Sequence, residues 1–169
     1  DPRRPSSRPS TQARATSRPS CARSEALGTM EDGELEFMRA LRDRDLGRLR
    51  ALLPDDFCFH DHRRTGVGRL GSAEEYVAFV ATLFELTPDV LIERVYIVAV
   101  EAHGILEVGH LLGTRDGGEF ESVHARIVLQ QGGRVVATEL FEVEDLGVAR
   151  RLAASTAYCA NPETPRWWW

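Results

Sequence analysis

Apolar residues at helical spacing mark the first part of the candidate domain. They follow Met30 and recur three or four positions apart, at Leu35, Phe37, Met38, Leu41, Leu46, Leu49, Leu52 and Leu53. This period predicts amphipathic helices. The polar run RDRD interrupts the pattern, and Asp45 at its end can cap a second helix that Pro54 terminates.

A third helix is predicted over residues 73–86, with the sequence AEEYVAFVATLFEL. Ser72 precedes it and Glu75 follows three positions later, which is the S-x-x-E pattern of a capping box. Pro88 disfavours helical backbone at the residue before it, so the helix is expected to end just ahead of this proline.

Strand patterns fill most of the remaining chain. The segment FCFHDH (57–62) alternates as a short strand, and residues 146–154 can form a last short helix. Four longer strands are expected between the two, with hairpin turns at His103–Gly104, Asp116–Gly118 and Gly132–Gly133. We place them at 90–101, 105–115, 120–130 and 134–143. Helices segregated from an antiparallel meander indicate the α+β class.

The 169 residues suit one domain with tails. We assign the domain to residues 30–153. Residues 1–29 are rich in Arg, Ser and Pro and poor in large apolar side chains, so we expect a disordered linker or a non-native start. Residues 154–169 show no periodicity and are expected to be an unstructured tail.

Charge and composition exclude several classes of protein. The net charge of −5 argues against nucleic-acid binding, and no apolar run reaches the roughly 18 residues of a membrane span. Cys21, Cys58 and Cys159 contain no CxxC pair, so neither a zinc site nor a disulfide framework is indicated. We therefore expect a cytoplasmic protein that binds no cofactor, nucleic acid or membrane.

Two motifs carry a resemblance to a known family. The first motif is LLPDDFCFHD (52–61), which follows two predicted helices and precedes a Gly-rich loop. The second is the later GRVV (133–136). Together they resemble ketosteroid isomerase and the SnoaL-like branch of the nuclear-transport-factor-2-like superfamily. The resemblance covers about residues 30–145. It implies a cone in which three N-terminal helices pack on a curved, mostly antiparallel sheet around a ligand-binding cavity.

The resemblance places Asp61 at the position of the family's general base. Asp61 also shares its alternation register with Phe57 and Phe59, so it is expected to point toward the apolar side. Loss of hydration there would raise its pKa and make it a better base. The alternative is a helix cap or an ion pair with a neighbouring arginine, namely Arg63, Arg64 or Arg69.

His110 is the candidate partner of Asp61. It shares a strand register with the apolar Leu106, Val108 and Leu112, and the family match turns the same register inward. A neutral imidazole could donate to an oxyanion or shuttle a proton. The alternative is a buried histidine that hydrogen-bonds a backbone carbonyl.

The chain departs from ketosteroid isomerase at the oxyanion hole. Phe37 occupies the position of the family's tyrosine and Ala125 that of its protonated acid, and neither side chain can donate a hydrogen bond. Loss of one such donor costs about 10²–10³ in rate. Steroid isomerisation by the family mechanism is therefore not expected.

The remaining positions divide between the pocket and the outer sheet face. The expected pocket lining is apolar and aromatic, with Glu142 as a rim acid, although the mixed pattern of the last strand also allows Glu139 inward. This lining comprises Phe37, Phe57, Phe59, Tyr76, Phe79, Leu83, Val108, Leu112, Val123, Ala125, Thr138, Leu140 and Glu142. His124 and Arg126 are expected on the outer face, through which the resemblance implies a homodimer.

His60 and His62 share one strand face, so both could bind a single metal ion. The sequence identifies no third ligand and places arginines alongside, so no metal is expected. Two functions stay open. The first is a non-catalytic module that binds a small, largely apolar ligand or dimerises. The second is an isomerase-like or cyclase-like enzyme that moves a proton on a small carbonyl compound, with Asp61 as base and His110 as partner.

Overall fold

The computed structural model describes residues 21–101 and 103–154 of the chain, with side chains from Asp32 onward. This part of the chain forms four α-helices, six strands and one short 3-10 helix. In chain order the elements are α1 (Cys21–Arg42), α2 (Leu46–Leu52), β1 (Cys58–Asp61), β2 (Gly68–Leu70), α3 (Ala73–Leu86), β3 (Leu91–Glu101), β4 (Gly104–Arg115), β5 (Gly118–Gln131), β6 (Arg134–Glu142), η1 (Val143–Asp145) and α4 (Leu146–Ala153).

The predicted elements are confirmed with small shifts of their ends. Helix α3 has its expected bounds, and the four long strands lie where the turns placed them. Strand β2 lies in a segment that was predicted to be an irregular loop. Helix α1 begins at Cys21, before the expected start at Met30, and the Ala and Leu residues of the added segment favour helical backbone. Residues 1–20 and the tail from residue 155 lie outside the described part.

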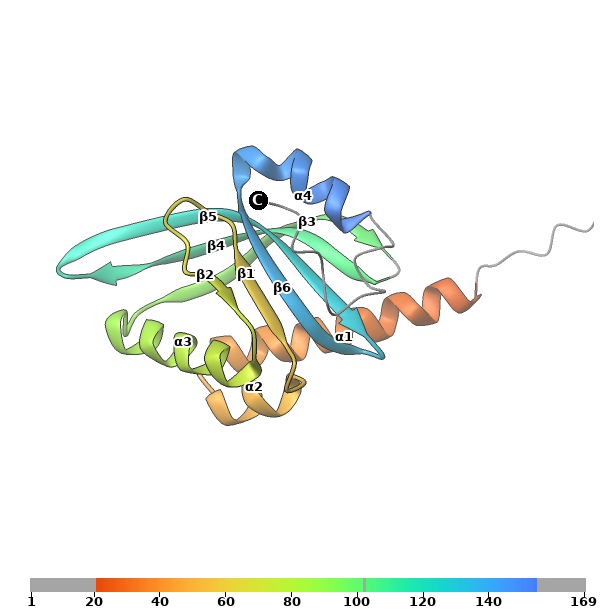
Figure 1. Ribbon diagram of the computed structural model, residues 1–169, viewed down its shortest axis with the longest axis horizontal. Coiled ribbons are helices and arrows are strands. Elements are labelled where there is room, and N and C mark those ends of the chain that lie inside the picture. The colour runs from red at the N-terminus through yellow and green to blue at the C-terminus, as the bar shows by residue number, and fades with distance from the viewer. Residues whose placement is uncertain (1–20, 102, 155–169) are drawn as a thin grey trace, which may run out of the picture.

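The strands form one curved sheet in the order β2-β1-β6-β5-β4-β3. Strand β1 runs parallel to β6, and the other neighbours pair antiparallel. Figure 1 shows α1, α2 and α3 on one face of this sheet and α4 on the other. We call the face under α1–α3 the inner face and the face under α4 the outer face. The expected α+β cone with three N-terminal helices on the sheet is confirmed.

Aromatic side chains fill the space between the inner face and the helices. Phe37, Phe57, Phe59 and Tyr76 are each at most 5% exposed, and all belong to one core cluster. The Tyr76 ring lies 5.0 Å from that of Phe57 and 5.1 Å from that of Phe59, measured between centroids. Burial raises the pKa of Tyr76, so its hydroxyl stays protonated. These four positions of the predicted pocket lining are therefore core residues of the inner face.

A second core cluster lies on the outer face, where α4 covers the sheet. It contains Ala149 and Ala153 of α4 together with Leu106, Ala125, Ile127, Leu129 and Phe141 from the strands. The central strands are consequently buried on both faces. This arrangement decides which of their side chains point toward the helices.

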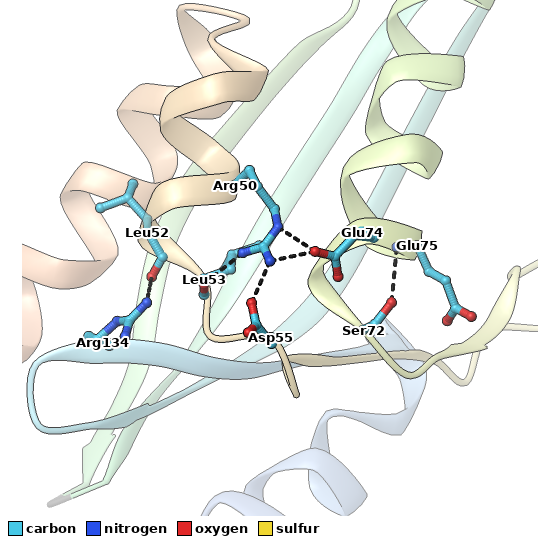
Figure 2. A network of polar contacts seen from close by, with 8 residues as sticks. All are labelled: Arg50, Leu52, Leu53, Asp55, Ser72, Glu74, Glu75 and Arg134. Atoms are coloured by element: carbon cyan, nitrogen blue, oxygen red, sulfur yellow. Dashed lines mark hydrogen bonds and ion pairs between the residues drawn. The ribbon is translucent and has the colours of Figure 1, made fainter.

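Polar contacts join the end of α2 to the start of α3 (Figure 2). The Arg50 guanidinium binds the Glu74 carboxylate, with Nε 2.8 Å from Oε1, and also contacts Asp55. Ser72 Oγ accepts the Glu75 backbone N–H at 3.2 Å, which confirms the predicted cap. These contacts fix α3 beside β1 and hold Tyr76 over the inner face.

Candidate functional site

The β4–β5 hairpin sets which residues face the helices. Its antiparallel register pairs Glu107 with Arg126, Gly109 with His124 and His110 with Val123. Arg126 contacts Glu34 and Met38 of α1, so the Glu107, Arg126 and His124 side chains belong to the inner face. The predicted outer position of His124 and Arg126 is wrong.

The same register places His110 on the outer face, away from Asp61. Its Nε2 lies 2.8 Å from Glu121 Oε1 of the neighbouring strand. Four residues that were predicted to line the pocket lie on the same side of β4 and β5 as His110 and therefore also face outward. They are Val108, Leu112, Val123 and Ala125. The physical reason is that α4 packs on this face, where it covers Leu106, Ala125 and Ile127, so apolar alternation on β4 and β5 marks the outer face.

Asp61 does lie on the inner face, and it is paired with an arginine. Its side chain is 1% exposed, and Arg63 binds it through Nε to Oδ1 at 2.8 Å and Nη2 to Oδ2 at 2.7 Å. Burial alone would raise the pKa of Asp61, but the hydrogen bonds and charge of Arg63 outweigh it and hold the pKa below its ordinary value. The predicted raised pKa is wrong, and the alternative of an ion pair with Arg63 is confirmed.

The loop after β1 closes over this carboxylate. Gly66 approaches so closely that a Cβ on it would lie 2.5 Å from Asp61 Cγ. On the other side, Arg63 Nη1 donates to Ser122 Oγ at 2.9 Å, which ties the loop to β5. Asp61 therefore orients Arg63 and the loop, and its lowered pKa makes it a weaker base than an unpaired carboxylate.

His124 lies two residues after Ser122, on the same face of β5, and is 5% exposed. Its Nδ1 is buried and makes no hydrogen bond of strict geometry among the described residues, although the Ser122 backbone lies close enough to interact with the ring and favour its charged form. Burial, together with the positive charges of Arg126 and Arg63, lowers the pKa of His124 to about 4. The imidazole is thus neutral near pH 7, and one ring nitrogen can still take a hydrogen bond.

A buried ionic network ties α1 to the sheet beside His124. Glu34 and Glu107 are both 0% exposed. Arg126 contacts both carboxylates, with Nη2 3.3 Å from Glu34 Oε1, and Arg94 Nη1 lies 2.5 Å from Glu34 Oε2. Burial and the negative charge of Glu107 raise the pKa of Glu34, against the charges of the arginines. The network is internally balanced and holds the helix on the inner face.

The last strand faces as the family match implied. Thr138 and Leu140 oppose Phe59 and Asp61 of β1, and Glu142 opposes His124 of β5. Glu142 Oε1 accepts the Arg64 backbone N–H at 3.1 Å, at the edge of the site. On α3, Phe79 packs against the inner core, and Leu83 is half-buried. Glu139 faces outward.

Sequence reasoning missed His124 and the ionic network, although one signal pointed to them. The hairpin turn at Asp116-Gly117 fixes the β4–β5 register, and counting from it places Glu107 directly across from Arg126. Opposite charges at such a cross-strand pair mark one polar face of the sheet. Glu34 gave no comparable signal, because its partners come from distant strands.

The comparisons with known proteins agree with this architecture. The family model of the SnoaL-like domain matches residues 35–151, more than half of the chain. The chain therefore belongs to the SnoaL-like family. No curated protein matches it.

Solved structures share the fold at low sequence identity. A protein from Jannaschia sp. CCS1 described as a SnoaL-like polyketide cyclase has a TM-score of 0.58 and 18% identity, over 76% of this chain and 94% of that one. A ketosteroid isomerase-like protein from Catenulispora acidiphila, in complex with trimethylamine, has a TM-score of 0.55 and 13% identity, over 66% and 86%. An epoxide hydrolase of LEH-like type from M. tuberculosis has a TM-score of 0.55 and 18% identity, over 78% and 94%. These likenesses show the nuclear-transport-factor-2-like fold.

No helix within the described residues combines the length and the apolar character needed to cross a bilayer.

Proposed function

We propose that this SnoaL-like domain binds a small, largely apolar ligand on its inner face without catalysing a reaction. The observation that carries the proposal is the buried, neutral His124 on the inner face, whose Nδ1 makes no hydrogen bond of strict geometry within the described part of the chain. Small-molecule sites are mostly apolar and contain a few placed polar groups. His124 would supply that polar contact, and the partly buried aromatic side chain of Phe79 on α3 would supply apolar surface.

The pKa values argue against proton transfer here. A general base works best when its pKa lies near the operating pH. The pKa of His124 is about 4, and Asp61 is held by Arg63 with its pKa lowered. The enzyme hypothesis with Asp61 and His110 also fails geometrically, because these side chains lie on opposite faces of the sheet. Binding is the function that these residues favour.

Equilibrium binding to matched ligand pairs tests the proposal. The panel contains cyclic alcohols, ketones and phenols, each with its hydrocarbon counterpart, such as 2-naphthol with naphthalene. One net hydrogen bond contributes about 1 kcal/mol, so the polar member should bind roughly fivefold tighter. That preference should vanish in His124→Phe and persist in His110→Phe, which changes the outer face instead. A preference that survives His124→Phe, or a panel without any binder, would refute the proposal.

We also propose that the domain forms a homodimer through its outer face, as the family resemblance implies. Large apolar side chains remain exposed there, with Leu91 at 48%, Tyr96 at 53% and Val123 at 44%. Exposed apolar patches of this kind mark interaction sites. Tyr96→Glu should shift the mass measured by light scattering from dimer to monomer, whereas Glu85→Gln on α3 should not. A monomeric unsubstituted chain at the concentrations used for binding would contradict this assignment.

A further inference from the structure

Three ligand-type side chains meet on the outer face where β1 joins β6. His60 of β1 points outward, because its neighbours Phe59 and Asp61 point inward. His62, which directly follows β1, also lies on the outer face, against Glu139 and Phe141. Figure 1 shows β1 beside β6. Their parallel pairing sets Glu139 level with His60. The third ligand that the sequence did not identify therefore comes from a strand about eighty residues away.

These side chains already lie close to one another. His62 Nε2 is 2.8 Å from Glu139 Oε2, and the His60 and His62 ring centroids are 3.7 Å apart. One donor atom from each of the three residues lies within 4.8 Å of the other two. Phe141 stacks on the His62 ring, with centroids 4.4 Å apart, and holds it in this orientation. Three donors converge on a point that remains accessible beside the exposed His62.

We propose that His60, His62 and Glu139 form a binding site for a divalent transition-metal ion of the zinc class. Two imidazoles and one carboxylate are a ligand set that Zn²⁺ accepts, with a fourth position left to water. Imidazole nitrogen selects Zn²⁺, Cu²⁺, Ni²⁺ and Co²⁺ over Mg²⁺ and Ca²⁺, which take oxygen ligands. The site lies on the opposite side of the sheet from His124, so it does not depend on the proposed ligand site.

The rearrangement that an ion requires is small. Tetrahedral zinc with ligand distances of about 2.0–2.2 Å separates its donor atoms by roughly 3.3 Å. The His62 and Glu139 donors must therefore move apart by about half an ångström, and the widest pair must close by about 1.5 Å. Arg63 does not face the site, because its guanidinium binds Asp61 on the inner face. Arg69 of β2 lies opposite His60 of β1. Its positive charge disfavours a bound cation, whereas the negative charge of Glu139 favours one.

Titration of the full chain with Co²⁺ and Zn²⁺ tests the site. The unsubstituted protein should bind one Zn²⁺ by calorimetry, and Co²⁺ should give tetrahedral d–d absorption without a thiolate charge-transfer band. Zn²⁺ should displace that signal, and Mg²⁺ should not. His62→Ala and Glu139→Gln should each weaken binding at least about tenfold, since even outer-shell partners of a metal contribute that much. His110→Ala is the matched control, because this outer-face histidine also pairs with a glutamate.

Two results would overturn the proposal. One is the absence of saturable Zn²⁺ binding by the unsubstituted chain. The other is binding that both His62→Ala and Glu139→Gln retain, as would happen if the cysteines held the ion. Circular dichroism on each variant separates loss of the site from loss of the fold, and Glu139→Gln keeps the side-chain shape if His62→Ala does not fold.

Discussion

At the residue scale, Gly109 makes room for the His124 ring. A Cβ at position 109 would lie 2.6 Å from His124 Nε2. Gly109→Ala should therefore displace the imidazole and lower the free energy of unfolding by about 1–3 kcal/mol, which is typical of overpacking. Urea denaturation measures this change. Gly118→Ala is the control, since its Cβ would meet only an ordinary contact at 3.6 Å and should cost less than about 0.5 kcal/mol. Equal effects of the two substitutions would contradict this placement of His124.

The Asp61–Arg63 pair gives a prediction about pH. The pKa of Asp61 in the folded chain lies below its ordinary value of 3.8, so the pair stabilises the fold above that pH and loses its contribution as the pH falls. Arg63→Gln leaves a buried carboxylate unpaired and should raise this pKa above 3.8. The variant should then lose about 3 kcal/mol at pH 7 and less near pH 4, where Asp61 binds a proton.

NMR titration of the Asp61 carboxyl carbon, with denaturation at both pH values, checks this prediction. Arg64→Gln is the matched control, because the contact of Arg64 with Glu142 uses its backbone N–H. A lowered Asp61 pKa that persists in Arg63→Gln would show that Arg63 is not its cause.

At the element scale, the buried network determines how α1 sits on the sheet. Arg126→Met would leave Glu34 and Glu107 facing each other with Arg94 as their remaining cation. We expect a loss of about 3–5 kcal/mol at pH 7. The loss should be smaller at pH 5, because the pKa of Glu34 is already raised and protonation relieves the repulsion. Urea denaturation at both pH values measures it, with exposed Arg134→Met as the control. A loss below 1 kcal/mol at pH 7 would contradict the role of the network.

Individual elements could be predicted from the sequence better than the directions of their side chains. The Ser72 cap and Pro88 bound α3, and the glycine-containing turns bound the four long strands. Short-range chemistry determines these boundaries. The faces of β4 and β5 could not be predicted in the same way, because alternation separates the two sides of a strand without showing which side the N-terminal helices cover. Alternation correctly grouped His110 with Val108, yet it could not show that this side of the strands is the one on which α4 packs.

At the scale of the whole molecule, the order of helices and strands was enough to predict the SnoaL-like cone. The match over residues 35–151 confirms the family. The site depended on contacts between distant segments, such as Arg63 with Ser122 and Glu34 with Arg126. Asp61 was predicted on the inner face correctly, since it alternates with Phe57 and Phe59. Its partner and its pKa required the fold of the loop that follows it.

The most direct test is NMR titration of the five histidine side chains of the full chain, with and without a ligand from the binding panel. We expect His124 to stay neutral until about pH 4 and its ring resonances to shift when ligand binds, while those of His110 do not. A His124 that titrates near the ordinary value of 6.5, or a ligand that shifts His110 instead, would contradict the assignment of the inner face as the binding site.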